Sequence, residues 1–505
     1  MLYCNMLNQT YKKGENMLHI KNVKKIGELQ DFFCEQEKAS DTIVDIYKKF
    51  SILKTAKMLN KYKKKGYLAT DVLLVLLHLP FFAVSSIRAL IKSGNAKLSE
   101  AQQDVYYRLK NNSNICWRLL QYCFCKRFEK LAKENENKSN EVVKCFIIDD
   151  TLLPKTGKTI EGIGKVFDHI TRRCLLGFKA LVLGYFDGKS FLPLDFSLHN
   201  EKGKNKNRPY GLSKKEIKER YRKHRDVRSA GAKRKQELST SKIDNALSML
   251  KRAVKHGFQA DYLLMDKWFI SEVVIRTVRK IKKYTLHVIA ACKMDKRKYI
   301  YEDKEYTAKE LLRNNKKRMH RSKRLRAYYV ELIVEYKGFR LKLFFNRFSK
   351  RGNWELLITT DTKLTFNKLM QIYSIRWSIE VFFKESKQYL KLGSCQSQDF
   401  DAQIADITIC MIQYIILSLY KRKSSYETIG ELFRNSKELM VELTIADRLW
   451  QLFLSLQLKI AQVFEIDVND IIEQMIQTPD YDNKILKILI LLSNEQEKVS
   501  FNNAA

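Results

Sequence analysis

Three acidic residues of this sequence could together support cleavage of a phosphodiester. Asp149 follows an apolar run at residues 142–148, Asp266 follows a short apolar segment at 262–265, and Glu380 lies in a segment with a helical pattern. Two-metal cleavage needs carboxylates from different elements that converge on ions about 3.5 to 4 Å apart. Mg²⁺ suits such a site because it takes oxygen ligands and keeps several waters, and Mn²⁺ is expected to substitute for it.

Each aspartate also has a purely structural interpretation. Asp149 could form a turn or cap after its strand, and Asp266 could be the N-cap of a following helix. Asp150 adjoins Asp149. Because side chains alternate along a strand, only one of these two neighbours can point into a site.

The segment around Glu380 is more specific. Tyr373, Arg376, Glu380 and Lys387 are spaced by three, four and seven residues, so on an α-helix they fall on nearly one stripe. Such a stripe could hold a metal ion through Glu380 while Arg376 and Lys387 neutralise phosphates. The alternative is a chain of surface ion pairs, Arg376 with Glu380 and Glu380 with Lys384. The helix is predicted to be largely buried because it carries apolar neighbours of these residues, and charged side chains in a buried helix suggest a function. The neighbours are Ile375, Trp377, Ile379, Phe382 and Phe383.

The surrounding pattern predicts an α/β core that positions these residues. Its order is strand-strand-strand-helix-strand-helix-strand, which is that of a ribonuclease-H-like core. The expected strands are 142–148, 175–185, 191–198, 262–265 and 286–291, and the expected helices are 239–256 and 271–281. Asp187-Gly188 predicts a hairpin turn between the second and third strands.

A β-rich insertion is predicted at about 292–362, before the helix that carries Glu380. That helix is expected from Phe366 to about Leu392, with Gly393 as its stop. Residues 1–130 and 393–505 are predicted to be helical, as a DNA-binding region and a possible dimerisation region. A charged linker is expected at 130–141.

The charge indicates a nucleic-acid partner. The net charge of +38 over 505 residues favours polyanions, because each phosphate contacted releases counterions. Residues 201–236 and 313–326 concentrate Lys and Arg beside the expected core, and we expect both to contact DNA. No apolar run is long enough for a convincing membrane span, and no signal peptide is evident. The expectation is a cytoplasmic, nucleoid-associated protein without a membrane partner. The 10 cysteines lack zinc spacing and are expected to be reduced.

The helix segment identifies a family resemblance. Residues 373–387, YSIRWSIEVFFKESK, fit the Tyr-x2-Arg-x3-Glu-x6-Lys signature of the insertion-sequence-4 family of bacterial DDE transposases. Asp149-x-Thr151 resembles that family's first aspartate motif, and the segment around Asp266 resembles its second. The long gap before Glu380 is similar to the family's β-strand insertion. The resemblance covers roughly residues 142–392, within an expected catalytic domain at 140–392.

The resemblance implies a role for each matching residue. Asp149, Asp266 and Glu380 would bind the metal ions, with Asp149 favoured over Asp150 because a hydroxyl residue follows two positions later. Tyr373, Arg376 and Lys387 would hold the phosphates of the transposon end. In the family, a tryptophan of the insertion can hold a flipped base. Trp354 is the only tryptophan of the insertion here, but a core position in a strand is the favoured interpretation.

The implied activity is cut-and-paste transposition. The substrates would be the terminal inverted repeats and target DNA, with a nick, a hairpin intermediate and strand transfer, carried out by at least a dimer. Two other classes remain open: a non-catalytic DNA-binding protein derived from a transposase, and a ribonuclease-H-like nuclease without strand transfer.

Overall fold

The computed structural model describes the middle of the chain. It covers residues 50–423 except 64, 82–85, 93–100, 134–141, 170 and 282–284. All described residues belong to one unit, Ile43–Lys437. The predictions for residues 1–49 and 424–505, and for most of the linker, lie outside the described residues.

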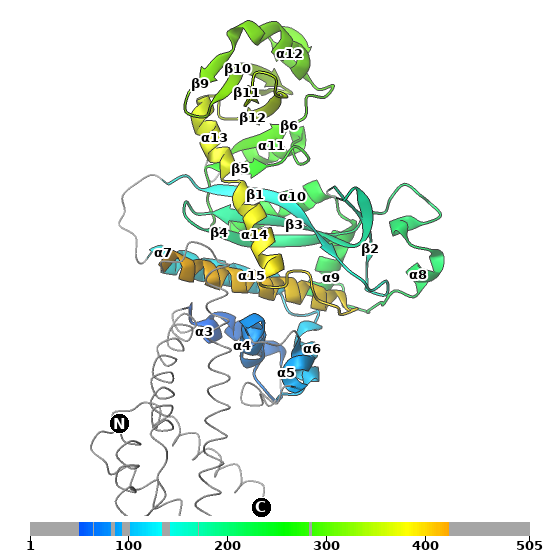
Figure 1. The fold of residues 1–505 in the computed structure, drawn as a ribbon. Helices are drawn as coiled ribbons and strands as arrows, with labels where there is room; N and C mark the ends of the chain where they lie inside the picture. The colour runs from blue at the N-terminus through cyan, green and yellow to red at the C-terminus, as the bar shows by residue number, and fades with distance from the viewer. Residues whose placement is uncertain are drawn as a thin grey trace, which may run out of the picture. The chain divides into compact units, whose positions relative to one another are not determined.

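Five strands form the core of the sheet (Figure 1), in the order β4-β3-β1-β5-β6. The strands β4, β3 and β1 are antiparallel, whereas β1, β5 and β6 are parallel. Together with two intervening helices, this arrangement confirms the α/β, ribonuclease-H-like fold. The elements are β1 (Cys145–Pro154), β3 (Arg173–Phe186), β4 (Phe191–His199), α10 (Lys242–Lys255), β5 (Tyr262–Met265), α11 (Glu272–Arg279) and β6 (His287–Cys292).

Strand β1 is longer than its apolar run predicts. It continues through Asp149 and Asp150 to Pro154, because antiparallel pairing with β3 persists along its whole length. Its parallel pairing with β5 ends at Ile148 and Met265. The interpretation of Asp149 as a turn or cap after the strand is therefore wrong: Asp149 lies within the strand, where one of its two partner strands has stopped.

The sequence pattern missed one strand of the core. β2 (Gly164–Asp168) pairs with the first part of β3, and β4 pairs with the rest. The connection from β4 to α10 holds only short helices: η4 (Pro209–Gly211), α8 (Lys214–Lys218), α9 (Ala230–Gln236) and η5 (Glu237–Ser239).

The β-rich insertion continues the core sheet. The strand that returns from the insertion, β12, pairs antiparallel with β6, so the insertion and the core share one 12-stranded sheet. The insertion therefore extends the core and does not merely interrupt it. Its elements are β7 (Lys298–Tyr301), β8 (Lys304–Thr307), α12 (Ala308–Asn315), η6 (Lys316–Arg318), β9 (His320–Ser322), β10 (Ala327–Tyr336), β11 (Phe339–Arg347) and β12 (Glu355–Thr359).

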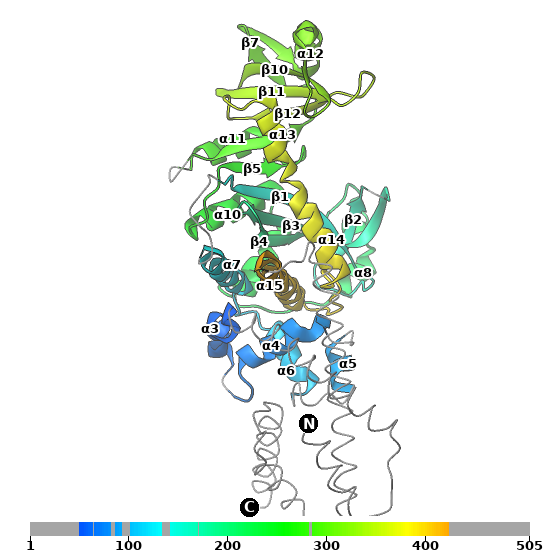
Figure 2. The ribbon, with the colours of Figure 1, turned by 60° about the vertical axis from the view of Figure 1, so that its left-hand side comes forward.

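The long helix predicted from Phe366 is two helices. α13 (Phe366–Ser374) and α14 (Trp377–Gln388) meet at Ile375 and Arg376, where backbone bonds span three residues and tighten the turn. α14 ends before the expected stop at Gly393, which has φ +84° and lies against Leu153. Figure 2 shows the pair crossing in front of the sheet.

Helices before and after the core pack together. α15 (Phe400–Lys423) contacts α7 (Trp117–Lys133), and both contact β4. Among the described helices, only α15 is long and apolar enough to cross a membrane, and 94% of its most apolar stretch is buried within the protein. It therefore has the surroundings of a core helix, and its buried side chains do not supply the dimer contact predicted from this region. The remaining helices are α3 (Ile52–Ala56), η1 (Lys57–Tyr62), α4 (Ala69–His78), η2 (Leu79–Phe81), α5 (Ile87–Lys92) and α6 (Gln103–Lys110).

A buried carboxylate of β4 joins helices α7 and α10 to the sheet. Asp195 of β4 is 1% exposed, and its two oxygens accept from Arg118 of α7 at 2.7 Å and from Arg252 of α10 at 2.8 Å. Burial alone raises the pKa of a carboxyl, but these guanidinium groups hold the pKa of Asp195 below its usual value.

The Asp195 contacts predict a large loss of stability in Asp195→Ala. Removing the carboxylate takes one of two acidic partners from Arg118, which keeps Glu237, and the acidic partner of the part-buried Arg252. Breaking a buried pair costs up to roughly 3–5 kcal/mol. The thermal unfolding midpoint should fall by several degrees. The matched control is Asp104→Ala, because the Asp104–Arg108 pair is exposed and surface pairs contribute about 0–1 kcal/mol. Equal midpoints for the two variants would contradict the role of Asp195.

Candidate active site

The register of β1 and β5 brings two aspartates to one edge. Ile148 pairs with Met265 at the last parallel position, so Asp149 and Asp266 follow it on neighbouring strands. Asp266 is not a helix cap: its carbonyl accepts from Phe269 in a turn, and the side chain of Ser271 caps α11. Two carboxylates are therefore side by side at the point where the strands separate.

Asp149 and Asp150 face different helices. Asp149 accepts from Arg376, at the start of α14, whereas Asp150 accepts from Lys242 of α10 at 2.6 Å. This is the alternation expected of adjacent strand residues. The structure thus places Asp149, and not Asp150, on the side of Glu380.

Arg376 joins two of the predicted site residues. Its guanidinium donates to Asp149 Oδ2 at 2.9 Å and to Glu380 Oε1 at 2.6 Å. The Arg376 side chain is 17% exposed, and those of Asp149 and Glu380 are 19% and 33% exposed. In the described part of the chain, no hydrogen bond or ion pair joins Arg376 to Asp266. The Arg376–Glu380 ion pair that the surface alternative expects is present. It differs from a surface pair because Arg376 also contacts Asp149 on a strand and because both side chains are partly buried.

Tyr373 lies against the end of β5. Its hydroxyl donates to the carbonyl of Met265, the residue before Asp266, at 3.4 Å. Burial raises the pKa of Tyr373 to about 12. The phenol is therefore protonated at neutral pH and is a donor, which makes it a poor nucleophile.

Lys387 reaches the first aspartate motif from the other end of α14. Its ammonium donates to Thr151 Oγ1 at 2.7 Å, which joins the lysine to the hydroxyl residue two positions after Asp149. Glu385 lies on another face of α14, as its spacing predicts, and accepts from Tyr414 of α15 at 3.4 Å.

The edge carries uncompensated negative charge. Burial raises the pKa of Asp149 to about 7, and the nearby Asp150 and Asp266 add to the shift, although a backbone amide and Arg376 oppose it. Because ionisation of this carboxyl is costly even beside an arginine, further positive charge nearby would stabilise its ionised form.

The donor set fits a divalent cation chemically. Carboxylate oxygens are the ligands that Mg²⁺ takes in proteins. In the described residues, no three His, Cys, Asp or Glu side chains are grouped closely enough to hold a metal ion. Arg376 is in contact with both Asp149 and Glu380, so the guanidinium supplies the positive charge between them in this structure.

Two exposed tryptophans beside the site were not predicted. Trp377, adjacent to Arg376, is 61% exposed, and Trp268, two residues after Asp266, is 58% exposed. Lys293 Nζ lies 3.4 Å from the centre of the Trp268 ring, and His169 stacks on that ring at 5.7 Å. The expectation of a buried Trp377 is wrong. The available signal was a tryptophan within two residues of Asp266 and of Arg376.

Trp354 is not a core tryptophan. It directly precedes β12, is half-buried and lies 4.6 Å from the Arg347 guanidinium. The interpretation as a strand residue of the core is therefore wrong.

Part of the predicted DNA-binding charge is structural. Arg225, in the basic segment at 201–236, pairs with Glu161, Asp399 and Asp401 and is 4% exposed. Such a buried cation is not available to DNA. The cations of the second segment, 313–326, are exposed.

Two family models match overlapping parts of this chain. Residues 93–327, which include Asp149 and Asp266, match the family model "DDE superfamily endonuclease". Residues 239–416, which include Asp266 and Glu380, match the family model "Transposase DDE domain". No curated protein matches the chain. The chain thus carries a domain of the DDE endonuclease and transposase type, which implies a DNA substrate and dependence on a divalent metal.

The Arg376 bridge predicts competition with Mg²⁺. In Arg376→Gln, the carboxylates lose their internal cation, so Mg²⁺ should raise the thermal midpoint more than in wild type. A gain of about 1 kcal/mol corresponds to roughly 2–4 °C. Asp149→Asn in the Arg376→Gln background should remove the added response. Equal Mg²⁺ shifts in wild type and Arg376→Gln would show that the guanidinium does not compete.

Proposed function

We propose that this protein is a cut-and-paste DNA transposase of the insertion-sequence-4 type. The observation that carries the proposal is the contact of Arg376 with Asp149 and Glu380, next to Asp266 at the shared edge of β1 and β5. Arg376 thus joins Asp149 of the sheet to Glu380 of α14, both of which lie within the stretches that the two family models match.

Asp149, Asp266 and Glu380 are the residues that would hold two Mg²⁺ ions. When bound, the ions would supply activation of the attacking oxygen and stabilisation of the leaving oxygen. Arg376 would then turn at least part of its guanidinium from the carboxylates to a phosphate, for which its planar fork is suited. Lys387 would present a point charge to the neighbouring phosphate.

Tyr373 is proposed as a phosphate contact. Its protonated hydroxyl can donate to a phosphate oxygen, and its raised pKa disfavours attack by the phenolate. The chemistry would then proceed without a covalent protein–DNA intermediate. Hydrolysis at the element's end frees a 3′-OH, which attacks the opposite strand to form a hairpin. The reopened end finally attacks target DNA.

The proposal also assigns the partners. Double-stranded DNA is the substrate, and two copies of the chain would hold a pair of ends in the cytoplasm of a bacterium. The N-terminal region to residue 130 would contribute DNA contacts. A dimer contact from the C-terminal region would come from beyond α15, since the side chains of α15 are largely buried in their own chain.

The decisive variant is Glu380→Gln. With Mg²⁺ and a plasmid that carries the element's ends, excision should fall by at least about 10²- to 10³-fold, the cost typical of losing one electrostatic group at a reacting phosphate or carbonyl. Binding to the ends should remain. Glu385→Gln is the matched control, because Glu385 is on the same helix but faces α15.

The outcomes separate the competing functions. Excision and joining by wild type and Glu385→Gln alone support the transposase. Cleavage of the ends without any joining product indicates a nuclease, and binding with no cleavage by any form indicates a non-catalytic DNA-binding protein.

The role of Tyr373 predicts a graded defect. Tyr373→Phe should weaken cleavage by about tenfold, as expected for one hydrogen bond to a charged group, whereas Asp266→Ala should abolish it. Single-turnover cleavage of a labelled end measures both. If Tyr373→Phe were as inactive as Asp266→Ala, the tyrosine would be more than a phosphate contact.

A further inference from the structure

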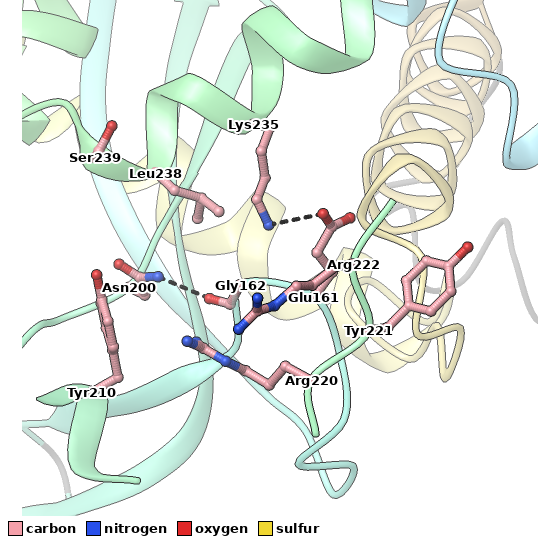
Figure 3. Close-up of a pocket in the computed structure, with 10 residues that line it drawn as sticks. All are labelled: Glu161, Gly162, Asn200, Tyr210, Arg220, Tyr221, Arg222, Lys235, Leu238 and Ser239. Atoms are coloured by element: carbon pink, nitrogen blue, oxygen red, sulfur yellow. Dashed lines mark hydrogen bonds and ion pairs between the residues drawn. The ribbon is translucent and has the colours of Figure 1, made fainter. Parts of the chain in front are cut away.

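A basic pocket lies outside the candidate active site. It has a volume of about 380 Å³ and lies between the β1–β2 connection and the segment from β4 to α10 (Figure 3). Arg220, Arg222 and Lys235 line it together with Glu161, and the rings of Tyr210 and Tyr221 flank it. Neither the metal site nor the phosphate contacts proposed above use these residues.

The pocket holds more positive than negative charge. Its only carboxylate, Glu161, accepts from Arg225 through both oxygens, at 2.8 and 2.6 Å, and lies 3.4 Å from Lys235. In the described part of the chain, no carboxylate pairs with Arg220 or Arg222. Arg220 donates to the carbonyl of Ile163 at 2.8 Å, which leaves most of its donors open.

The walls of the pocket are fixed by local contacts. Tyr210 has φ 61°, an uncommon conformation for a residue with a side chain, and its ring lies 5.2 Å from the Arg220 guanidinium. Asn200 donates to the carbonyl of Gly162 at 2.8 Å. Gly162 has φ +73°, and a Cβ there would meet Leu238 at 2.7 Å. Tyr210 is thus held at a positive φ beside the pocket, and the backbone at Gly162 leaves no room for a side chain.

Two of the pocket cations, Arg220 and Lys235, are partly buried, whereas Arg222 is exposed. Burial lowers the pKa of Arg220, and the neighbouring Arg222 lowers it further. Burial also lowers the pKa of Lys235 although Glu161 opposes this. Three cations beside a single carboxylate, which Arg225 already neutralises, favour an anion, and arginine forks match the oxygens of a phosphate.

We propose that this pocket binds the phosphodiester backbone of DNA at a distance from the cleaved phosphate. The inference rests on the proposed function, because it requires DNA as the substrate. Arg220 and Arg222 would donate to phosphate oxygens, with Tyr221 beside them at the exposed rim.

Strand β2 sets the distance between the pocket and the active site. Gly164, at its start, lies against Tyr210. His169, just after its end, stacks on Trp268 beside Asp266. Five residues of strand span about 17 Å, which corresponds to about five nucleotides at 3.4 Å each. For a duplex whose axis follows β2, the pocket should contact the backbone about five nucleotides from the cleavage site.

The first experiment measures the salt dependence of DNA binding. Full-length wild type and the double variant Arg220→Gln/Arg222→Gln are compared on a duplex of the element's end in EDTA. Loss of two phosphate contacts should reduce the slope of log K against log salt by about 1–2 and weaken binding at least about tenfold. The control is Lys251→Gln/Lys255→Gln, which removes the same charge from exposed positions of α10, outside the basic segments 201–236 and 313–326. An unchanged slope in the pocket variant would overturn the inference.

The second experiment locates the contact. Neutral methylphosphonates about four to six nucleotides from the cleavage site should weaken binding of wild type but not of the pocket variant. An Arg220→Lys/Arg222→Lys variant with restored slope would exclude misfolding as the cause. Calorimetry with inorganic phosphate and with a mononucleotide tests a small-molecule site: tight binding of either, with no methylphosphonate effect, would overturn the inference.

Failure of the inference is distinguishable from failure of the proposed function. If wild type cleaves the ends and the pocket variant binds DNA normally, only the pocket assignment is wrong. If wild type binds no DNA, the proposed function fails and the pocket assignment fails with it.

Discussion

The parallel pairing of β1 with β5 is the constraint on which the site depends. Side chains alternate along a strand, so a shift of one residue would turn Asp149 away from Glu380 and bring Asp150 in its place. The register is held by the antiparallel partner β3, which continues along β1 after β5 has ended at Met265. A long strand beside a short one therefore leaves an open edge at which acidic side chains can gather without loss of backbone pairing.

Gathering acidic side chains works against the stability of the fold, and Arg376 offsets this. Its guanidinium contacts carboxylates from the sheet and from α14, so it also orients the helix on the strand. Asp195 shows the contrasting case, in which arginines compensate a buried carboxylate well enough to keep its pKa low. At Asp149, burial raises the pKa to about 7 even though Arg376 opposes the shift, so the compensation is incomplete. Incomplete compensation is the property that a cation-binding site requires.

Local patterns predicted the parts of the structure that depend on nearby residues. Apolar runs located β1 and β5, and helical spacing paired Arg376 with Glu380. The parts that were missed depend on distant partners. The extension of β1 past Asp149 requires β3, and the pairing of β6 with β12 joins segments more than 60 residues apart. The exposure of Trp377 was missed because an apolar residue beside a buried stripe resembles core in a linear pattern.

The pairing of β6 with β12 has a consequence for how such a chain can evolve. The main chain leaves the core at Cys292 and returns at Leu356, its direct partner across the ladder, so the exit and the re-entry are one strand spacing, about 4.8 Å, apart. The segment between them can gain or lose residues, as a surface loop does, while α13 and α14 still start from the same place. The insertion can thus diverge in length while Asp149, Asp266 and Glu380 keep their places around one edge of the sheet.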